Sequence, residues 1–167
     1  MIINSGFVDK FLKKKNSKHI SPYSGTVFEP ICQLAPRSKG AFFESILVDF
    51  LRSKGATIKK SGCFDYTILV NGQRIVVKSS MLWEDGTFKW QQIKLDREFD
   101  AVMFLAVYPE RIDVYHASRD TCKTHLDIKT DKGWIHNQHG GRKVRSGTFV
   151  LNGNPENIPW LKLMDVV

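Results

Sequence analysis

The dipeptide Asn71-Gly72 is the feature that most restricts how this chain can fold. It separates two runs rich in β-branched and aromatic residues, 64–70 and 73–80. Asn-Gly favours the two positive-φ positions of a type I′ turn, which is a common two-residue connection in β-hairpins. The pattern therefore predicts an antiparallel hairpin in which Val70 faces Gln73.

The register of this hairpin brings an acidic residue opposite a lysine. Counting outward from the turn, Asp65 faces Lys78, and directly opposed side chains start about 4.5–5.5 Å apart at Cβ. Alternation places Asp65, Val76 and Lys78 on one face of the sheet. The other face is expected to carry Phe64, Tyr66, Ile75 and Val77. Lys78 ends an apolar run, and a charged side chain in such a strand needs either an ion-pair partner or a functional role. The simpler interpretation is an exposed ion pair of little energetic weight.

A helix is expected just before the hairpin. Ser38 suits its N-cap and Gly55 its C-terminal end. The apolar side chains between them form a stripe about half the circumference wide, and they are Phe42, Phe43, Ile46, Leu47, Phe50 and Leu51. Glu44 and Asp49 lie at the two borders of this stripe.

The rest of the chain predicts a mixture of strands, short helices and loops. Strands are expected at 56–60, 99–108, 111–116 and 148–151, short helices near 5–15 and 120–125, an irregular segment at 16–37, and either strand or helix at 87–95. This order indicates an α/β domain with a mixed sheet. We expect one domain over residues 1–167, with its core at about 38–119 and with loops and a terminal strand over 120–167.

Charge and composition indicate a class of partner. The chain has 25 Lys and Arg against 17 Asp and Glu, a net charge of +8, which favours nucleic acid as the partner. The alternative is a protein-interaction domain whose charge serves only solubility. No apolar run reaches the roughly 20 residues of a membrane span, and no secretory signal begins the sequence. Three widely spaced cysteines, Cys32, Cys63 and Cys122, predict a reduced, cytoplasmic protein.

The order of acidic and basic residues resembles the PD-(D/E)XK nuclease superfamily, which includes type II restriction endonucleases and Holliday-junction resolvases. The resemblance covers about 39–119: Glu44 matches the helical acid, Asp65 the metal-binding Asp, and Lys78 the lysine. It implies a restriction-endonuclease-like mixed β-sheet flanked by helices, and a magnesium-dependent endonuclease acting on double-stranded DNA. Glu44 and Asp65 would bind Mg²⁺, with Mn²⁺ as a substitute, and a homodimer would cut both strands.

One position departs from the pattern of that superfamily. Two residues before Lys78 the motif has a carboxylate or an amide, whereas this chain has Val76. Three interpretations stay open. The chain is an inactive relative or an engineered knockout, or another residue supplies the missing ligand, with Glu44 as the first candidate. In the third, the true lysine motif lies later in the chain, at residues 92–94. The hairpin favours the earlier motif because it aligns Lys78 with Asp65. An inactive site would leave a non-cleaving DNA-binding module.

Polar side chains outside the motif are expected to contact DNA. The Gly-containing segment 134–145 combines amides with cations, which suit phosphate contacts and base-edge readout. The residues expected to bind DNA are Gln91, Gln92, Asn137, Gln138, Arg142, Lys143 and Arg145. Gln91 and Gln92 would hold a water or a phosphate. The simpler interpretation of each is a polar surface residue.

Overall fold

The computed structural model describes residues 21–126, 134–138 and 147–164. A six-stranded mixed sheet lies at its centre, with strand order β1-β2-β3-β5-β6-β9. β3 and β5 are parallel, and the other neighbouring pairs are antiparallel. The strands are β1 (Ile58–Lys60), β2 (Ile68–Val70), β3 (Gln73–Met81), β5 (Ala101–Val107), β6 (Ile112–Ser118) and β9 (Lys162–Leu163). The predicted α/β class with a mixed sheet is confirmed.

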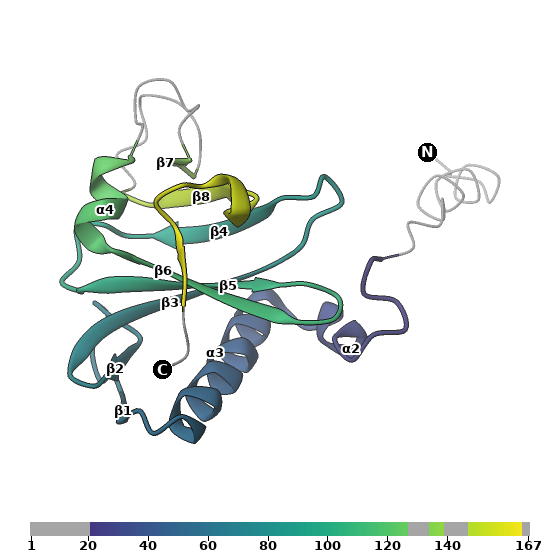
Figure 1. The fold of residues 1–167 in the computed structure, drawn as a ribbon, viewed down its shortest axis with the longest axis horizontal. Coiled ribbons are helices and arrows are strands. Elements are labelled where there is room, and N and C mark those ends of the chain that lie inside the picture. Colours follow the sequence, from purple (N-terminus) through teal and green to yellow (C-terminus); the bar gives the residue numbers. More distant parts are fainter. Residues whose placement is uncertain (1–20, 127–133, 139–146, 165–167) are drawn as a thin grey trace, which may run out of the picture.

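A smaller sheet and one long helix cover opposite faces of the central sheet. The smaller sheet has the order β4-β8-β7, and the helix is α3 (Figure 1). The remaining elements complete the fold: α2 (Glu29–Cys32), α3 (Pro36–Ser53), α4 (Arg119–Thr124), β4 (Phe88–Ile93), β7 (Ile135–Asn137), β8 (Phe149–Gly153) and the 3₁₀ turn η1 (Pro155–Asn157). The central sheet is therefore the middle layer of three.

Two apolar cores hold these layers together. Between the two sheets, Trp90 and Phe104 are fully buried, and the Trp90 indole N–H donates to the Leu105 carbonyl at 2.9 Å. On the opposite face, α3 packs Phe43 and Leu47 against Ile75 and its neighbours. Because side chains alternate along a strand, β3 contributes to both cores.

The helix and the hairpin follow the sequence pattern with small corrections. α3 begins at Pro36, with Ala35 rather than Ser38 as its N-cap, because proline suits the first helical turn. Gly55, at φ +87°, follows its C-terminal end. The predicted stripe was too wide, since Phe42 is 38% and Phe50 40% exposed.

The hairpin register is confirmed, but its first strand is shorter than predicted. Val70 pairs with Gln73. Regular pairing ends at Ile68, but Thr67 still bonds to β3: its N–H donates to the Ile75 carbonyl at 2.8 Å, and its hydroxyl accepts from the Val77 N–H at 3.0 Å. The Ser61 N–H donates to the Thr67 carbonyl at 3.1 Å, so residues 61–67 form a loop. Asp65 therefore lies in this loop and not directly opposite Lys78. The loop also breaks the alternation, so Tyr66 packs on the same side as Val76.

The other predictions meet mixed outcomes. The ambiguous segment 87–95 contains β4, and strands and a short helix form near 56–60, 99–108, 111–116, 120–125 and 148–151 as expected. β7 and β9 were not predicted, and α2 lies in the segment expected to be irregular. The helix expected near 5–15 lies outside the described residues. None of the described helices is both long and apolar enough to span a membrane.

Candidate functional site

The edge of β3 that faces β2 is open near Lys78 and Ser79. β5 pairs with β3 from Ile75 to Met81. β2 pairs with residues 73–75, and beyond them the Val77 N–H donates to the Thr67 hydroxyl at 3.0 Å. The next contact from the other direction is the Lys89 N–H of β4, which donates to the Ser80 hydroxyl at 2.9 Å. The gap between β2 and β4 leaves room for two cavities, one on each side of β3.

The smaller cavity contains most of the predicted catalytic residues. It measures about 200 Å³ and is lined by Phe64, Asp65, Tyr66, Thr67, Val76, Lys78, Gln92, Lys94 and Arg97. Asp65, Val76 and Lys78 thus meet in one place, and β4 brings in Gln92. Val76 also packs against the core between the sheets, so the floor of the cavity is apolar.

The smaller cavity is electropositive. Burial, together with the nearby charges of Lys94 and Arg97, lowers the pKa of the Lys78 ammonium from 10.5 to about 8. Asp65 is the only carboxylate among the lining residues. Within the described chain, no carboxylate forms an ion pair with Lys78. Three cations around one carboxylate favour an anionic ligand such as a phosphate.

A hydrogen bond holds the two loops of this cavity together. The Arg97 guanidinium, from the segment after β4, donates to the Phe64 carbonyl in the loop before β2. The position of Asp65, the next residue along the chain, is therefore tied to the segment that carries Lys94.

Gln92 enters the cavity from a β-bulge. The pairing of β4 with β8 shifts register between Trp90 and Ile93, and Gln92 has a φ of +59°, an uncommon conformation for a residue with a side chain. Its N–H donates to Oε1 of Gln138 at 2.7 Å. Bulges commonly redirect a side chain next to a functional site. The adjacent amides of 91 and 92 were the only sequence signal for this feature.

Glu44 does not join Asp65 and Lys78 in the lining of the smaller cavity. The physical reason is strand alternation: Lys78 projects toward the smaller sheet, whereas α3 lies on the opposite face over Ile75. Glu44 is half-buried; burial raises the pKa of its carboxyl, and the charge of Lys60 partly opposes this rise. The prediction that both carboxylates share one cavity with Lys78 therefore needs this correction.

The predicted DNA-binding residues fall into separate places. Gln91 lines the larger cavity, and Gln138 holds the bulge at Gln92. Asn137 belongs to β7 and pairs with Phe149, so this part of the expected loop is a strand. The cationic positions Arg142, Lys143 and Arg145 lie outside the described residues.

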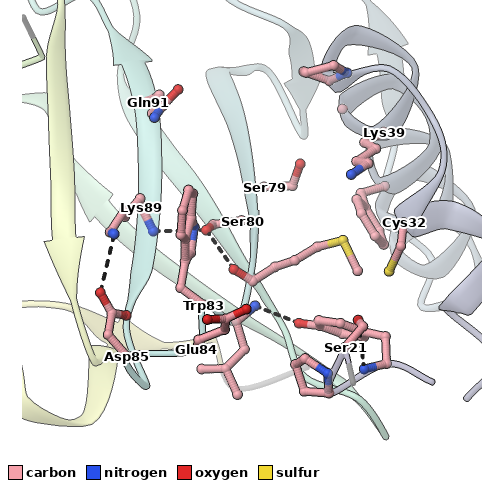
Figure 2. A pocket seen from close by; sticks show the side chains of 17 residues that line it. Ser21, Cys32, Lys39, Ser79, Ser80, Trp83, Glu84, Asp85, Lys89 and Gln91 are labelled. Atoms are coloured by element: carbon pink, nitrogen blue, oxygen red, sulfur yellow. Dashed lines mark hydrogen bonds and ion pairs between the residues drawn. The ribbon is translucent and has the colours of Figure 1, made fainter. Parts of the chain in front are cut away.

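The larger cavity was not predicted from the sequence. It measures about 750 Å³ and lies between α3 and the hairpin that joins β3 to β4 (Figure 2). Lys39, Ser79, Trp83 and Gln91 are among its lining residues. Ser79 follows Lys78 directly in the sequence, but nothing in the sequence pattern indicated that α3 would stand away from β3 here.

Oxygen donors for a metal ion are few at the smaller cavity. Among the described residues, no group of three or more His, Cys, Asp or Glu side chains is arranged to hold a metal ion. Asp65 offers a carboxylate and Gln92 an amide oxygen. Mg²⁺ is commonly bound through one or two carboxylates, with water and substrate phosphate as its other ligands. The donors fit an ion that binds together with a phosphate.

Comparisons with known proteins leave the family open. No family model matches the chain, and no curated protein matches it. Among solved structures, the bacterial homing endonuclease I-Ssp6803I is similar at 18% identity and a TM-score of 0.42, covering 52% of this chain and 67% of that one. A likeness of this size identifies neither a family nor a reaction, so function is argued from the residues of the site.

Proposed function

We propose that this chain is a magnesium-dependent DNA endonuclease of the restriction-enzyme-like kind. The observation that supports the proposal is that Asp65, Val76 and Lys78 line one cavity at an open strand edge. An Asp and a Lys on adjoining elements, in a cavity that Lys94 and Arg97 also line, suit attack on a phosphodiester. Cutting both strands of a duplex requires two such sites, so we propose a homodimer as the active form.

The cations of the smaller cavity would bind the phosphate that is cleaved. The Lys78 ammonium is largely shielded from solvent, and it has two cationic neighbours, Lys94 and Arg97. A phosphate oxygen relieves this repulsion, and negative charge that develops in the transition state relieves it further. In this proposal Lys78 stabilises that developing charge or orients the attacking water.

Asp65 and the Gln92 amide are the proposed ligands of magnesium at the smaller cavity. Glu44 lies on the other side of β3 and is not among these proposed ligands. A bound magnesium ion would polarise the phosphate and lower the pKa of an attacking water. The three neighbouring cations disfavour a divalent ion alone, so we expect the metal to bind only with DNA.

A non-cleaving DNA-binding module is the second candidate function. Two observations favour it: Val76 offers no ligand where the superfamily motif has one, and the described residues contain no cluster of three metal-binding side chains. In this module the same cations would hold the DNA backbone without hydrolysis.

Incubation of supercoiled plasmid with magnesium tests the proposal. The wild-type protein should nick the plasmid, and removing one charge-stabilising group commonly costs about 10²–10³ in rate, so Asp65→Asn and Lys78→Met should lose activity on that scale. Asp49→Asn is the matched control, because its side chain is 75% exposed on α3.

The same protein preparations distinguish the alternatives. Salt-sensitive retention of duplex DNA without nicking would favour the binding module over the endonuclease. Phosphate contacts are strong at about 50 mM salt. If the protein retains no DNA under that condition, both the endonuclease and the binding module are contradicted, and the net positive charge serves only solubility.

A further inference from the structure

The larger cavity has no role in the reaction proposed above. Its walls come from the segment 21–23, α2, the first turns of α3, the end of β3, the hairpin that follows β3 and the start of β4 (Figure 2). The apolar part of the lining includes Tyr23, Pro36, Phe43, Met81 and Leu82. Its polar part includes Lys39, Ser79 and Gln91, together with Ser80, Glu84, Asp85 and Lys89, which have partners of their own. A volume of about 750 Å³ lies within the usual range of small-molecule sites.

Three of the polar side chains that line this cavity have no partner among the described residues. Within the described chain, no hydrogen bond or ion pair is formed by the side chains of Lys39, Ser79 or Gln91. Figure 2 shows the Lys39 ammonium and the Ser79 hydroxyl directed toward each other from α3 and β3. Lys39 is half-buried, and a Cβ built on the neighbouring Gly40 would meet no atom within 4 Å. A partly buried ammonium beside open space favours an anion.

An aromatic ring is fixed at the mouth of the same cavity. Trp83 is 50% exposed, and the Lys89 ammonium lies 4.0 Å from its ring centre. Lys89 is itself paired with Asp85 at 3.3 Å, and Asp85 accepts hydrogen bonds from Thr87. These contacts hold the indole in place while part of it stays open to solvent. A fixed and exposed indole is a stacking surface for a planar ring.

We propose that the larger cavity is a subsite for one unpaired nucleotide of a DNA strand. Its phosphate binds at Lys39 and Ser79, its base stacks on Trp83, and Gln91 contacts the base edge. The inference rests on the proposed function for the identity of the polymer. An acidic peptide would satisfy Lys39 but would leave the indole without a planar partner, whereas a nucleotide supplies both an anion and a planar ring.

The positions of the two cavities support this assignment. Ser79 follows Lys78 on β3, and Gln91 precedes Gln92 on β4, so both strands contribute residues to both cavities. A DNA strand whose phosphodiester occupies the smaller cavity has its neighbouring nucleotide at the open edge of β3. That nucleotide reaches the larger cavity only if its base is unpaired, as bases are when enzymes extrude them.

The test uses two DNA duplexes of equal length, one blunt and one with a short overhang carrying 2-aminopurine. Wild-type protein, assayed without metal, should bind the overhang duplex about tenfold more tightly and should quench the 2-aminopurine by stacking. Trp83→Leu should abolish the quenching, and Lys39→Met should remove most of the tenfold preference. Trp83→Phe keeps a ring and should retain part of the quenching.

Lys54→Met is the control for charge, because Lys54 lies at the exposed C-terminal end of the same helix. It should change neither the preference nor the quenching. Thermal unfolding of each variant checks that the fold is retained. Quenching that persists in Trp83→Leu, or equal affinity of the wild type for both duplexes, would overturn the proposed subsite. The proposed function would still stand in that case if Lys78→Met weakens DNA binding. Failure to bind either duplex would overturn both proposals.

Discussion

The backbone N–H of Gln92 donates a hydrogen bond to Oε1 of Gln138, with 2.7 Å between the two atoms. This contact joins a β-bulge of β4 to the residue that follows β7. Gln92 has a φ of +59°, which costs a residue with a Cβ roughly 1–2 kcal/mol. The hydrogen bond compensates part of this cost and fixes the residue that lines the smaller cavity.

Replacing Gln138 by Ala should destabilise the protein and loosen the bulge. The lost hydrogen bond is worth about 1 kcal/mol, so we expect a decrease of that size in the unfolding free energy measured with urea. Gln92→Gly should be neutral or stabilising, since glycine adopts positive φ without strain. Gln33→Ala, at an exposed position, is the control. Equal stability of wild type and Gln138→Ala would show that the contact does not hold the bulge.

Replacing Val76 by Glu should increase magnesium-dependent cleavage. The new carboxylate would stand beside Lys78 in the smaller cavity and supply the missing oxygen ligand. We expect at least a tenfold gain in plasmid nicking and measurable magnesium binding by calorimetry. Because Val76 packs partly on the core, the variant should lose about 1–3 kcal/mol of stability. Val76→Thr, which adds no carboxylate, is the control; a Glu variant that gains neither property would contradict the assignment.

The local parts of this fold could be predicted from the sequence. Asn71-Gly72 adopts the positive φ angles that a type I′ turn needs, +48° and +87°, and the hairpin register follows from that turn alone. The meeting of Val76 and Lys78 in one cavity follows from strand alternation. The helix end at Gly55 is likewise a local signal.

The parts that could not be predicted depend on contacts between distant segments. β4 pairs with β8 about 60 residues later, and only this pairing defines the bulge at Gln92. The position of Asp65 depends on a loop closed by Ser61 and Thr67, which an extended strand pattern does not reveal. Glu44 was assigned by its order in the chain, and order does not specify which face of the sheet a helix covers.

Raising the pH should stabilise the wild-type protein relative to Lys78→Met. Burial and two cationic neighbours lower the pKa of Lys78 from 10.5 to about 8 in the folded state. At pH values between about 8 and 10.5, Lys78 keeps its proton in the unfolded chain but has released it in the folded chain. Stability rises with pH wherever the unfolded state binds more protons. The difference in unfolding free energy between the two proteins should therefore shift in favour of wild type from pH 7 to pH 10.

Urea unfolding at unit intervals of pH measures this shift. The other lysines and tyrosines titrate in both proteins, so their contributions cancel in the difference. A difference that stays flat across the range would mean that Lys78 titrates as an exposed lysine does, and that it is not enclosed in the smaller cavity.

Trp90 should be far more important for stability than Trp160. Trp90 is fully buried between the sheets, and its indole N–H is bonded to Leu105. Loss of a large buried aromatic commonly costs about 3–5 kcal/mol, so we expect that decrease for Trp90→Ala. Trp90→Phe should cost less but remain destabilising, because the Leu105 carbonyl loses its partner.

Trp160→Phe provides the matched comparison. The Trp160 indole nitrogen is buried without a hydrogen-bond partner among the described residues, so its removal sacrifices no hydrogen bond. We expect a smaller loss in unfolding free energy than for Trp90→Phe. Equal losses would mean that the bond between Trp90 and Leu105 contributes little to joining the two sheets.

Glu44→Gln should separate function from stability. Burial raises the pKa of the Glu44 carboxyl, with Lys60 opposing part of the rise, so the charged form is penalised in the folded state at neutral pH. Gln removes that penalty, and we expect stability at pH 7 to be equal or higher. The gain should shrink as the pH falls through the raised pKa of the Glu44 carboxyl, because the folded protein then takes up the proton that removes the charge.

Plasmid nicking by Glu44→Gln should stay at the wild-type rate, because the plane of the central sheet separates α3 from Lys78 and Asp65. Asp49→Asn, on the other border of α3, is the control and should likewise leave nicking unchanged. A wild-type rate for Glu44→Gln would be consistent with Asp65 as the carboxylate that binds the ion. A loss of two or more orders of magnitude, roughly the cost of losing one charge-stabilising group, would instead show that Glu44 takes part in the reaction and would contradict this placement.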